Sequence, residues 1–260
     1  MTKRATVKNR GLLTFAVALG AVMQVLDTSM ISVALPHLMG SLSATQDQVS
    51  WVLTFYVIAV AIVTPASSFL SLRIGQKRFF LICIVGFTTT SVFCGLSESL
   101  GEIVAFRTLQ GVFAAPLGPM SQAILLNNYE AEERGTAMGW WTIGMMFGPI
   151  FGPTFGGVIT EYLSWSWVFF VNVPIAVAAI ALVVLFVPDT KGSARHPFDV
   201  FGFLLLGIAL ATMQLTLDRG ERQDWFSSQE IWILTGMSAA AFYAFIVHSL
   251  TARNPFIDPA

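Results

Sequence analysis

Long apolar runs separated by short polar segments dominate the chain. A helix that crosses the apolar core of a bilayer needs roughly 20 consecutive apolar residues. The predicted spans are approximately Leu12–Leu38, Val49–Leu70, Phe79–Leu96, Gly101–Asn127, Thr136–Thr160, Trp167–Val187, Phe201–Leu217 and Ile231–Leu250. The strand-length alternation of a membrane barrel is absent from the sequence. The pattern therefore predicts an all-α polytopic membrane protein with eight spans.

Composition supports a chain whose surface faces lipid. Of the 260 residues, 55% are hydrophobic and only 11% are charged, whereas a soluble domain carries about a quarter charged residues. This excludes a cytosolic globular enzyme and a disordered chain. The net charge of -1 gives no general attraction to nucleic acid, so the lipid bilayer is the expected partner and nucleic acid is not.

The basic residues between the spans predict the orientation, because short cytoplasmic loops retain Lys and Arg. With a cytoplasmic N-terminus, the outer segments hold only Arg219 and Arg222. The inner segments then hold Lys3, Arg4, Lys8, Arg10, Arg73, Lys77, Arg78, Arg134, Lys191, Arg195 and Arg253. The first span is too long for a signal peptide, whose apolar stretch is about 7 to 15 residues. We expect a multi-pass protein with a cytoplasmic N-terminus.

Two ionisable residues, Asp27 and Arg107, interrupt the middle of predicted spans. Each costs about 2.5 to 3.5 kcal/mol on insertion scales, and such residues face a cavity or a partner. At about 1.5 Å per residue, Asp27 lies roughly 14 Å below the outer end of its helix and Arg107 roughly 9 Å below the outer end of the fourth. An arginine side chain spans that difference, so we expect the two to meet in the outer half of the membrane.

Two interpretations of this pair stay open. In one, Asp27 and Arg107 form a static ion pair that only fixes helix packing. In the other, they couple transport to protons: Asp27 exchanges a proton with a water-filled cavity, because desolvation favours its neutral form while a nearby guanidinium favours its charged form.

Residues that share the helical faces of these charges, or that polarise the fourth span, are candidates for lining a substrate cavity. They are Met23, Gln24, Met30, Gln110, Gly111, Ser121 and Gln122. Methionine adapts to irregular apolar shapes, although each Met taken singly is equally explained as a packing residue. No metal-binding spacing such as CxxC or HExxH occurs in the sequence, so we expect no metal site and no catalytic residue.

Glycines repeat every four residues in the fifth span, which predicts a close helix–helix contact. Four residues advance a helix by about 400°, so such glycines form one slowly drifting stripe. The motif comprises Gly144, Gly148, Pro149, Gly152, Pro153, Gly156 and Gly157. Because each proline removes a backbone donor and favours a bend, we expect a close-packed, bent interface.

The loop between the second and third spans contains Arg73, Gly75, Lys77 and Arg78. Its bases are what the preference for positive charge in cytoplasmic loops requires. A tight turn at Gly75 would also let the bases cap carbonyl groups at a helix end. We take both interpretations together.

These segments together resemble the major facilitator superfamily, and within it the fourteen-helix drug:proton antiporters of the EmrB/QacA type. Leu26–Pro36 is similar to the first-helix signature, although Ser32 stands where Asn is usual, and Arg107–Gly111 is similar to the fourth-helix motif implicated in proton coupling. Gly144–Gly157 is similar to the antiporter motif, and Trp165–Pro174 to the tryptophan-rich entry to helix six. The loop motif departs from the superfamily pattern, with Ser68 and Leu72 where Gly and Asp are usual.

The resemblance implies a domain organisation. Residues 1–188 would form a six-helix N-terminal bundle. Residues 189–260 would hold a cytoplasmic linker, transmembrane helices 7 and 8 and the start of the next loop. Because Asn254–Pro259 resembles the stretch that leads to helix nine, we expect the second bundle to be absent from this chain.

The resemblance also implies proton-coupled export of amphipathic drugs or other small organic compounds across the bacterial inner membrane, with the proton as coupling ion and no other cofactor. In EmrB-type relatives a membrane-fusion protein and an outer-membrane channel can extend the path. Export of a specific metabolite or siderophore is one alternative, and a truncated, non-transporting scaffold or binding subunit is another. A membrane enzyme is disfavoured, because the sequence offers no paired carboxylates or Ser/His arrangement.

Overall fold

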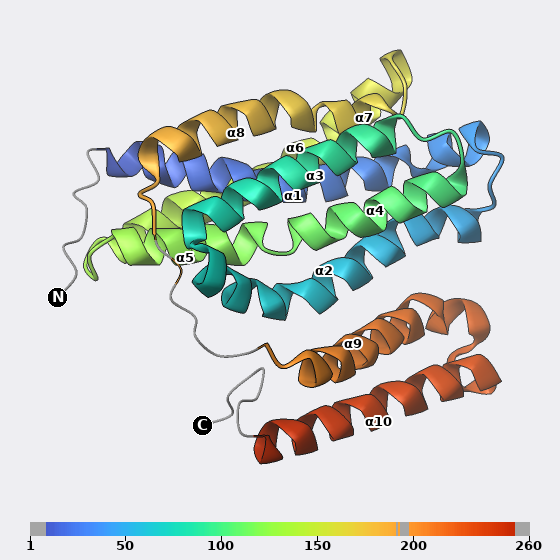
Figure 1. The fold of residues 1–260 in the computed structure, drawn as a ribbon. Helices are drawn as coiled ribbons and strands as arrows, with labels where there is room; N and C mark the ends of the chain where they lie inside the picture. Colours follow the sequence, from blue (N-terminus) through green and yellow to red (C-terminus); the bar gives the residue numbers. More distant parts are fainter. Residues whose placement is uncertain (1–8, 191, 193–197, 253–260) are drawn as a thin grey trace.

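The computed structural model describes residues 9–190, 192 and 198–252, and its regular elements there are all helical (Figure 1). The α-helices are α1 (Arg10–Ser41), α2 (Gln46–Ile74), α3 (Gln76–Gly95), α4 (Leu100–Ala114), α5 (Leu117–Asn128), α6 (Arg134–Tyr162), α7 (Trp167–Phe170), α8 (Asn172–Phe186), α9 (Val200–Gly220) and α10 (Gln229–Thr251). Eight segments of this part are long and apolar enough to cross a membrane. The prediction of eight helical spans is confirmed.

Two predicted spans contain a break. The fourth runs from Leu100 to Asn128, but α4 ends at Ala114 and α5 begins at Leu117. Pro116 lies in the break at the start of α5, where its missing amide does no harm to helical hydrogen bonding. The sixth span consists of α7 and α8.

Local sequence signals mark where several helices begin. Thr45 caps α2, because its Oγ1 accepts a hydrogen bond from the Gln48 amide while the Gln48 side chain accepts one from the Thr45 amide. Ser99 caps α4 by accepting from the Glu102 amide. Such caps satisfy amides that would otherwise lack a partner at a helix start.

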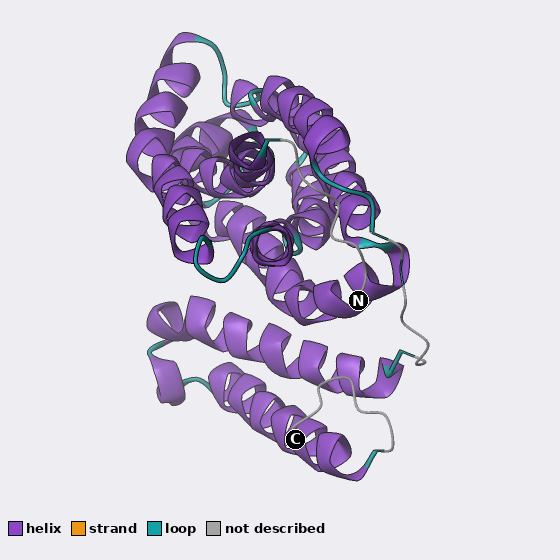
Figure 2. Ribbon diagram, turned by 90° about the vertical axis from the view of Figure 1, so that its left-hand side faces the viewer, coloured by secondary structure: helices purple, strands orange, loops and turns teal. Residues whose placement is uncertain are grey.

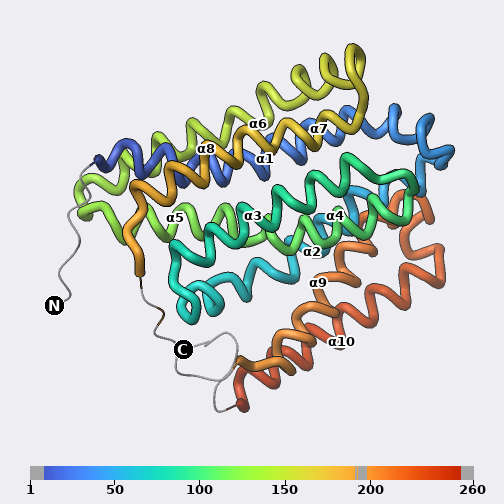
Figure 3. The backbone as a smooth tube through the Cα atoms, turned by 45° about the horizontal axis from the view of Figure 1, so that its top comes forward, coloured from blue at the N-terminus to red at the C-terminus, as the bar shows by residue number. Residues whose placement is uncertain are grey.

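The helices α1 to α8 form one bundle, and α9 and α10 form a hairpin at its side (Figures 1 and 2). The hairpin contacts the bundle through α2: Thr54 Oγ1 donates to Asp218 Oδ2 at 2.8 Å, and Arg222 pairs with Asp47 at 2.9 Å. The start of α1, the α2–α3 turn, the start of α6 and the end of α10 share one end of the molecule, and the α9–α10 turn lies at the other (Figure 3). The fold thus separates the two sets of segments that the basic residues predicted to be inner and outer.

The buried core consists of two apolar clusters, one towards each end of the bundle. On α1, the first cluster extends to Met23 and the second begins at Met30. Asp27 lies between these positions and is fully buried. The one carboxylate of α1 therefore occupies a layer between the two halves of the core.

Candidate functional site

The site is centred on an ion pair between α1 and α4. Asp27 Oδ2 lies 2.5 Å from Arg107 Nη1, and neither side chain is exposed to solvent. The predicted meeting of these two residues is confirmed. Its role in proton coupling stays a prediction.

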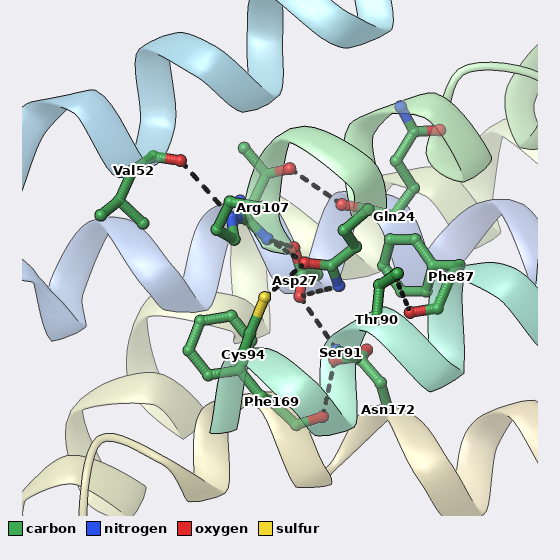
Figure 4. Close-up of polar contacts among 12 residues, drawn as sticks. Gln24, Asp27, Val52, Phe87, Thr90, Ser91, Cys94, Arg107, Phe169 and Asn172 are labelled. Carbon is green, nitrogen blue, oxygen red and sulfur yellow. Dashed lines mark hydrogen bonds and ion pairs between the residues drawn. The ribbon is translucent and has the colours of Figure 1, made fainter. Parts of the chain in front are cut away.

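Two amides complete the hydrogen bonding of the Asp27 carboxylate (Figure 4). Asp27 Oδ1 accepts from Gln110 Nε2 at 3.2 Å and from Asn172 Nδ2 at 2.9 Å. Gln110 Oε1 accepts in turn from Arg107 Nη1 at 2.8 Å. Helices α1, α4 and α8 thus meet at one polar group.

Asn172 is held in place by a further contact with α3. Its Nδ2 also lies 3.0 Å from Ser91 Oγ on α3, and that hydroxyl donates to the carbonyl of Phe169 at 2.9 Å. Phe169 belongs to α7, next to the break that separates α7 from α8. The chain of hydrogen bonds therefore extends from α1 across the bundle to α3 and α7.

The guanidinium of Arg107 is enclosed by further groups. Its carbon lies 4.0 Å from the centre of the Tyr56 ring and 5.8 Å from that of Phe169. Its Nε lies 3.5 Å from the Val52 carbonyl on α2. Cys94 on α3 lies close by, with its thiol 3.7 Å from Gln110 Oε1. The buried guanidinium thus contacts a carboxylate, an amide, a carbonyl and an aromatic face, while its Nη2 has no hydrogen-bond partner among the described residues.

This arrangement has two chemical states. The Asp27 carboxylate accepts hydrogen bonds from three donors, and removing either member of a buried pair leaves the other charge uncompensated. Protonation of Asp27 would remove the Coulombic contact with Arg107. Both side chains are fully buried in this conformation.

The predicted cavity residues lie at different places in the bundle. Most are inside it: Met23, Met30, Gln110 and Ser121 are buried, and Gln24 and Gln122 are half-buried. Gly111 is a packing position, because a Cβ there would lie 2.6 Å from the Tyr56 carbonyl oxygen. None of the seven lines the apolar cavity of about 580 Å³ between α1, α6 and α8, whose walls include Phe15, Trp140 and Ile175. Their role in substrate binding stays a prediction.

The glycine stripe of α6 packs against α1. A Cβ on Gly148 would lie 2.5 Å from Val25 Cγ1, and one on Gly152 would lie 2.5 Å from Ser29 Cβ. A Cβ on Gly156 would lie 2.9 Å from the Met30 carbonyl oxygen. The predicted close contact is confirmed and its partner is α1. Gly144 and Gly157 lie at the margins, where a Cβ would meet α1 at 3.6 Å and 3.9 Å, and α6 continues as one helix through Pro149 and Pro153.

The loop motif joins the α2–α3 turn to the end of α8. Gly75 has a φ of 98°, a conformation that side chains with a Cβ rarely adopt. Lys77 Nζ donates to the Val184 carbonyl in the last turn of α8 at 2.8 Å, as expected of a base that caps a helix end. Arg78 lies 3.4 Å from Asp189, and both are exposed. Arg73 ends α2.

Sequence reasoning missed Asn172, Ser91 and Tyr56 as parts of the site. Asn172 carried a signal, because it is a polar amide at the start of a very apolar span. Ser91 carried none, since serine hydroxyls commonly bond to their own helix backbone, and the aromatic ring of Tyr56 could not be told from a packing residue in an apolar span.

Comparison with protein families identifies the group to which the chain belongs. The Major Facilitator Superfamily model matches residues 17–255. The chain belongs to the major facilitator superfamily. Since all its described spans fall within or overlap the matched range, the polar site and the glycine stripe are both parts of a major facilitator bundle.

Among curated members, the chain is 40% identical over 249 residues to the multidrug export protein EmrB of Escherichia coli K12, covering 95% of this chain and 48% of that protein. It is 39% identical over 248 residues to EmrB of Haemophilus influenzae, with 95% and 49% covered. It is 34% identical over 246 residues to the fatty acid resistance protein FarB of Neisseria gonorrhoeae, with 94% and 48% covered. The chain thus spans about half the length of the curated relatives that it matches.

Two solved transporter structures have a similar fold. The POT family transporter PepTSo superposes with a TM-score of 0.65 at 12% identity, covering 95% of this chain and 55% of that one. A bacterial homologue of the human lysosomal transporter Spinster, inward-facing and unoccupied, gives 0.56 at 18% identity, covering 95% and 64%. At these identities the likeness concerns the fold.

Proposed function

We propose that this chain is the N-terminal part of a secondary active transporter that couples proton entry to export of amphipathic drugs or other small organic compounds. The observation that carries the proposal is the buried Asp27–Arg107 pair with its amides from α4 and α8. An ion pair that only fixes helix packing needs no more than hydrogen-bond partners for its two charged groups. This pair also lies between the two apolar halves of the core, so that three helices meet at a single ionisable group. The names of the EmrB relatives support drug export.

In the proposed cycle, Asp27 and Arg107 are paired in the conformation described above. A rearrangement of the bundle opens the site to water, and Asp27 then takes up a proton from the outer side. The neutral acid no longer holds Arg107, which favours the alternative conformation, and release of the proton to the cytoplasm restores the pair. No covalent chemistry is required, so we propose no enzymatic activity.

We further propose that the protein lies in a bacterial inner membrane with its N-terminus in the cytoplasm. The support is the distribution of bases: Arg73, Lys77 and Arg78 belong to one end of the bundle, and Arg219 and Arg222 to the other. A membrane-fusion protein and an outer-membrane channel are proposed partners, by resemblance to the EmrB type. Fusion of a periplasm-sensitive reporter after Ser41 and of a cytoplasm-sensitive reporter after Gly75 tests the orientation.

The experiment for transport uses the full natural polypeptide that contains this segment, in proteoliposomes with an imposed pH gradient. The probes are ethidium, a panel of amphipathic antibiotics and oleate. Asp27→Asn is expected to insert into the membrane but to lose proton-driven transport. Asp47→Asn is the matched control, because Asp47 is an exposed carboxylate on α2 outside the buried site.

Each result has a distinct meaning. Normal transport by Asp27→Asn would overturn proton coupling at this site. The interpretation of Asp27 and Arg107 as a static ion pair that only fixes helix packing would then remain. Transport of oleate alone would favour the narrower function suggested by the name of FarB. Transport of none of the probes by the wild-type polypeptide would contradict export of amphipathic compounds and favour a specific metabolite, a siderophore or a scaffold role.

A further inference from the structure

Arg107 has a second set of contacts that do not involve Asp27. Its Nε lies 3.5 Å from the Val52 carbonyl, and its guanidinium lies 4.0 Å from the centre of the Tyr56 ring. Both residues belong to α2, one turn apart. Gln110 adds a hydrogen bond from within α4. Asp27, by contrast, reaches the guanidinium from α1. The contacts from α2 and α4 do not depend on the charge of Asp27.

The Tyr56 ring is placed to bind a cation. It is 2% exposed, and the guanidinium carbon lies within the distance of about 6 Å at which a ring face attracts a cation, an attraction that grows when water is excluded. The other ring near Arg107, that of Phe169, is farther away at 5.8 Å. Tyr56 therefore supplies the closer aromatic contact of the two.

The ring acts differently on the two charge states of the site. In the ion pair, the negative ring face attracts the guanidinium but repels the nearby carboxylate of Asp27. Once Asp27 carries a proton, only the attraction remains. The titratable groups that face Arg107 are Asp27 from α1, Tyr56 itself from α2 and Cys94 from α3, while Phe169 and Asn172 from α7 and α8 are uncharged. The ring thus favours the state in which the pair is broken.

We propose that Tyr56 is a positioning residue for proton coupling, whose ring holds the Arg107 guanidinium against α2 while Asp27 carries a proton. This inference rests on the proposed function. Its consequence is that α2 and α4 stay together through Arg107 in both charge states, whereas α1 is released from them when Asp27 is neutral.

The test measures protonation of Asp27 directly, without a substrate. The protonated carboxyl group gives an infrared band, which is identified by its loss in Asp27→Asn and titrated against pH in the full natural polypeptide. Tyr56→Leu removes the ring face, and with it the repulsion of the Asp27 carboxylate, so it is expected to lower the midpoint. Tyr56→Phe keeps the ring and is expected to have the same midpoint as the wild type.

Two further variants separate this role from simple packing. Phe80→Leu removes an equally buried ring from the core of α3 away from Arg107 and is expected to leave the midpoint unchanged. Phenylalanine with one, two or three ring fluorines at position 56 weakens the ring's attraction for a cation at nearly constant shape, and is expected to lower the midpoint stepwise even if Tyr56→Leu fails to fold.

The outcomes distinguish this inference from the proposed function. If the Asp27 band titrates but the fluorinated series leaves its midpoint unchanged, the role of Tyr56 is overturned and proton coupling stands. If no band that depends on Asp27 titrates, the proposed coupling fails and this inference fails with it. If the band and its ring dependence are found but no probe is transported, only the proposed export function is contradicted.

Discussion

Replacement of Gly156 by alanine tests whether the glycine stripe of α6 is a close contact with α1. The added Cβ would lie 2.9 Å from the carbonyl oxygen of Met30 and 3.0 Å from its Cα. Both are backbone atoms, so they move only if α1 and α6 separate. Overpacking of this kind costs about 1 to 3 kcal/mol, whereas alanine gains about 1 kcal/mol over glycine in a helix. We expect the free energy of unfolding to fall by up to about 2 kcal/mol.

Gly144→Ala is the matched control on the same helix and the same stripe. Its Cβ would lie 3.6 Å from Val22 Cγ2, which is ordinary van der Waals contact, so it is expected to gain about 1 kcal/mol from helix propensity. Because the propensity gain is common to both variants, their difference of about 1 to 3 kcal/mol isolates the steric cost. The assay is unfolding in mixed micelles titrated with sodium dodecyl sulfate and followed by circular dichroism.

Equal stability of Gly156→Ala and Gly144→Ala would refute the reasoning, because it would mean that α6 does not approach the backbone of α1 at Gly156. An unfolding free energy below that of the wild type for both variants would also refute the reasoning, since Gly144 has room for a methyl group. The expected order is Gly144→Ala, then wild type, then Gly156→Ala, from most to least stable.

Two further predictions concern buried charge and the turn between α2 and α3. Arg107→Leu leaves Asp27 buried without its charged partner and is expected to lower the unfolding free energy by about 3 to 5 kcal/mol. The double variant with Asp27→Asn should recover part of this loss in a double-mutant cycle, and strict additivity would contradict the coupling. Gly75→Ala is expected to lower the unfolding free energy by roughly 1 to 3 kcal/mol, because φ is 98° and the added Cβ would collide with the Thr190 carbonyl. Gly139→Ala is the control, because a Cβ there would have no neighbour within 4 Å, and it should be no less stable than wild type.

The sequence predicted the elements because the cost of an unsatisfied backbone in lipid leaves only long apolar helices as spans. It also predicted the centre of the site, since Asp27 and Arg107 are isolated charges and their depths follow from the rise of a helix. The break between α4 and α5 coincides with Pro116, whose ring favours the start of a new helix. Each of these features can be derived from one segment of the sequence, or from the distance along a helix that its rise per residue gives.

What the sequence left open depends on how helices are rotated against one another. The glycine repeat predicted a close contact but not that its partner would be α1. The cavity residues were chosen because they share faces with Asp27 or Arg107, yet such faces point towards the other helices, which is why Met23 and Gln110 are buried. The contributions of Asn172 and Tyr56 arise from α8 and α2, whose orientation towards α4 is fixed only by packing of the whole bundle.

The two faces of α1 make contacts of different kinds. One face, at Val25 and Ser29, meets the glycines of α6 through steric contacts that carry no net charge. The other face meets α4 through Asp27 and Arg107, and this contact changes with protonation. In the proposed cycle, protonation would weaken the contact of α1 with α4 without loosening its contact with α6. If Arg107 stays with α2 and α4 as proposed, the bundle has a seam between α1 with α6 on one side and α2 with α4 on the other, and the charge of Asp27 sets how tightly that seam is closed.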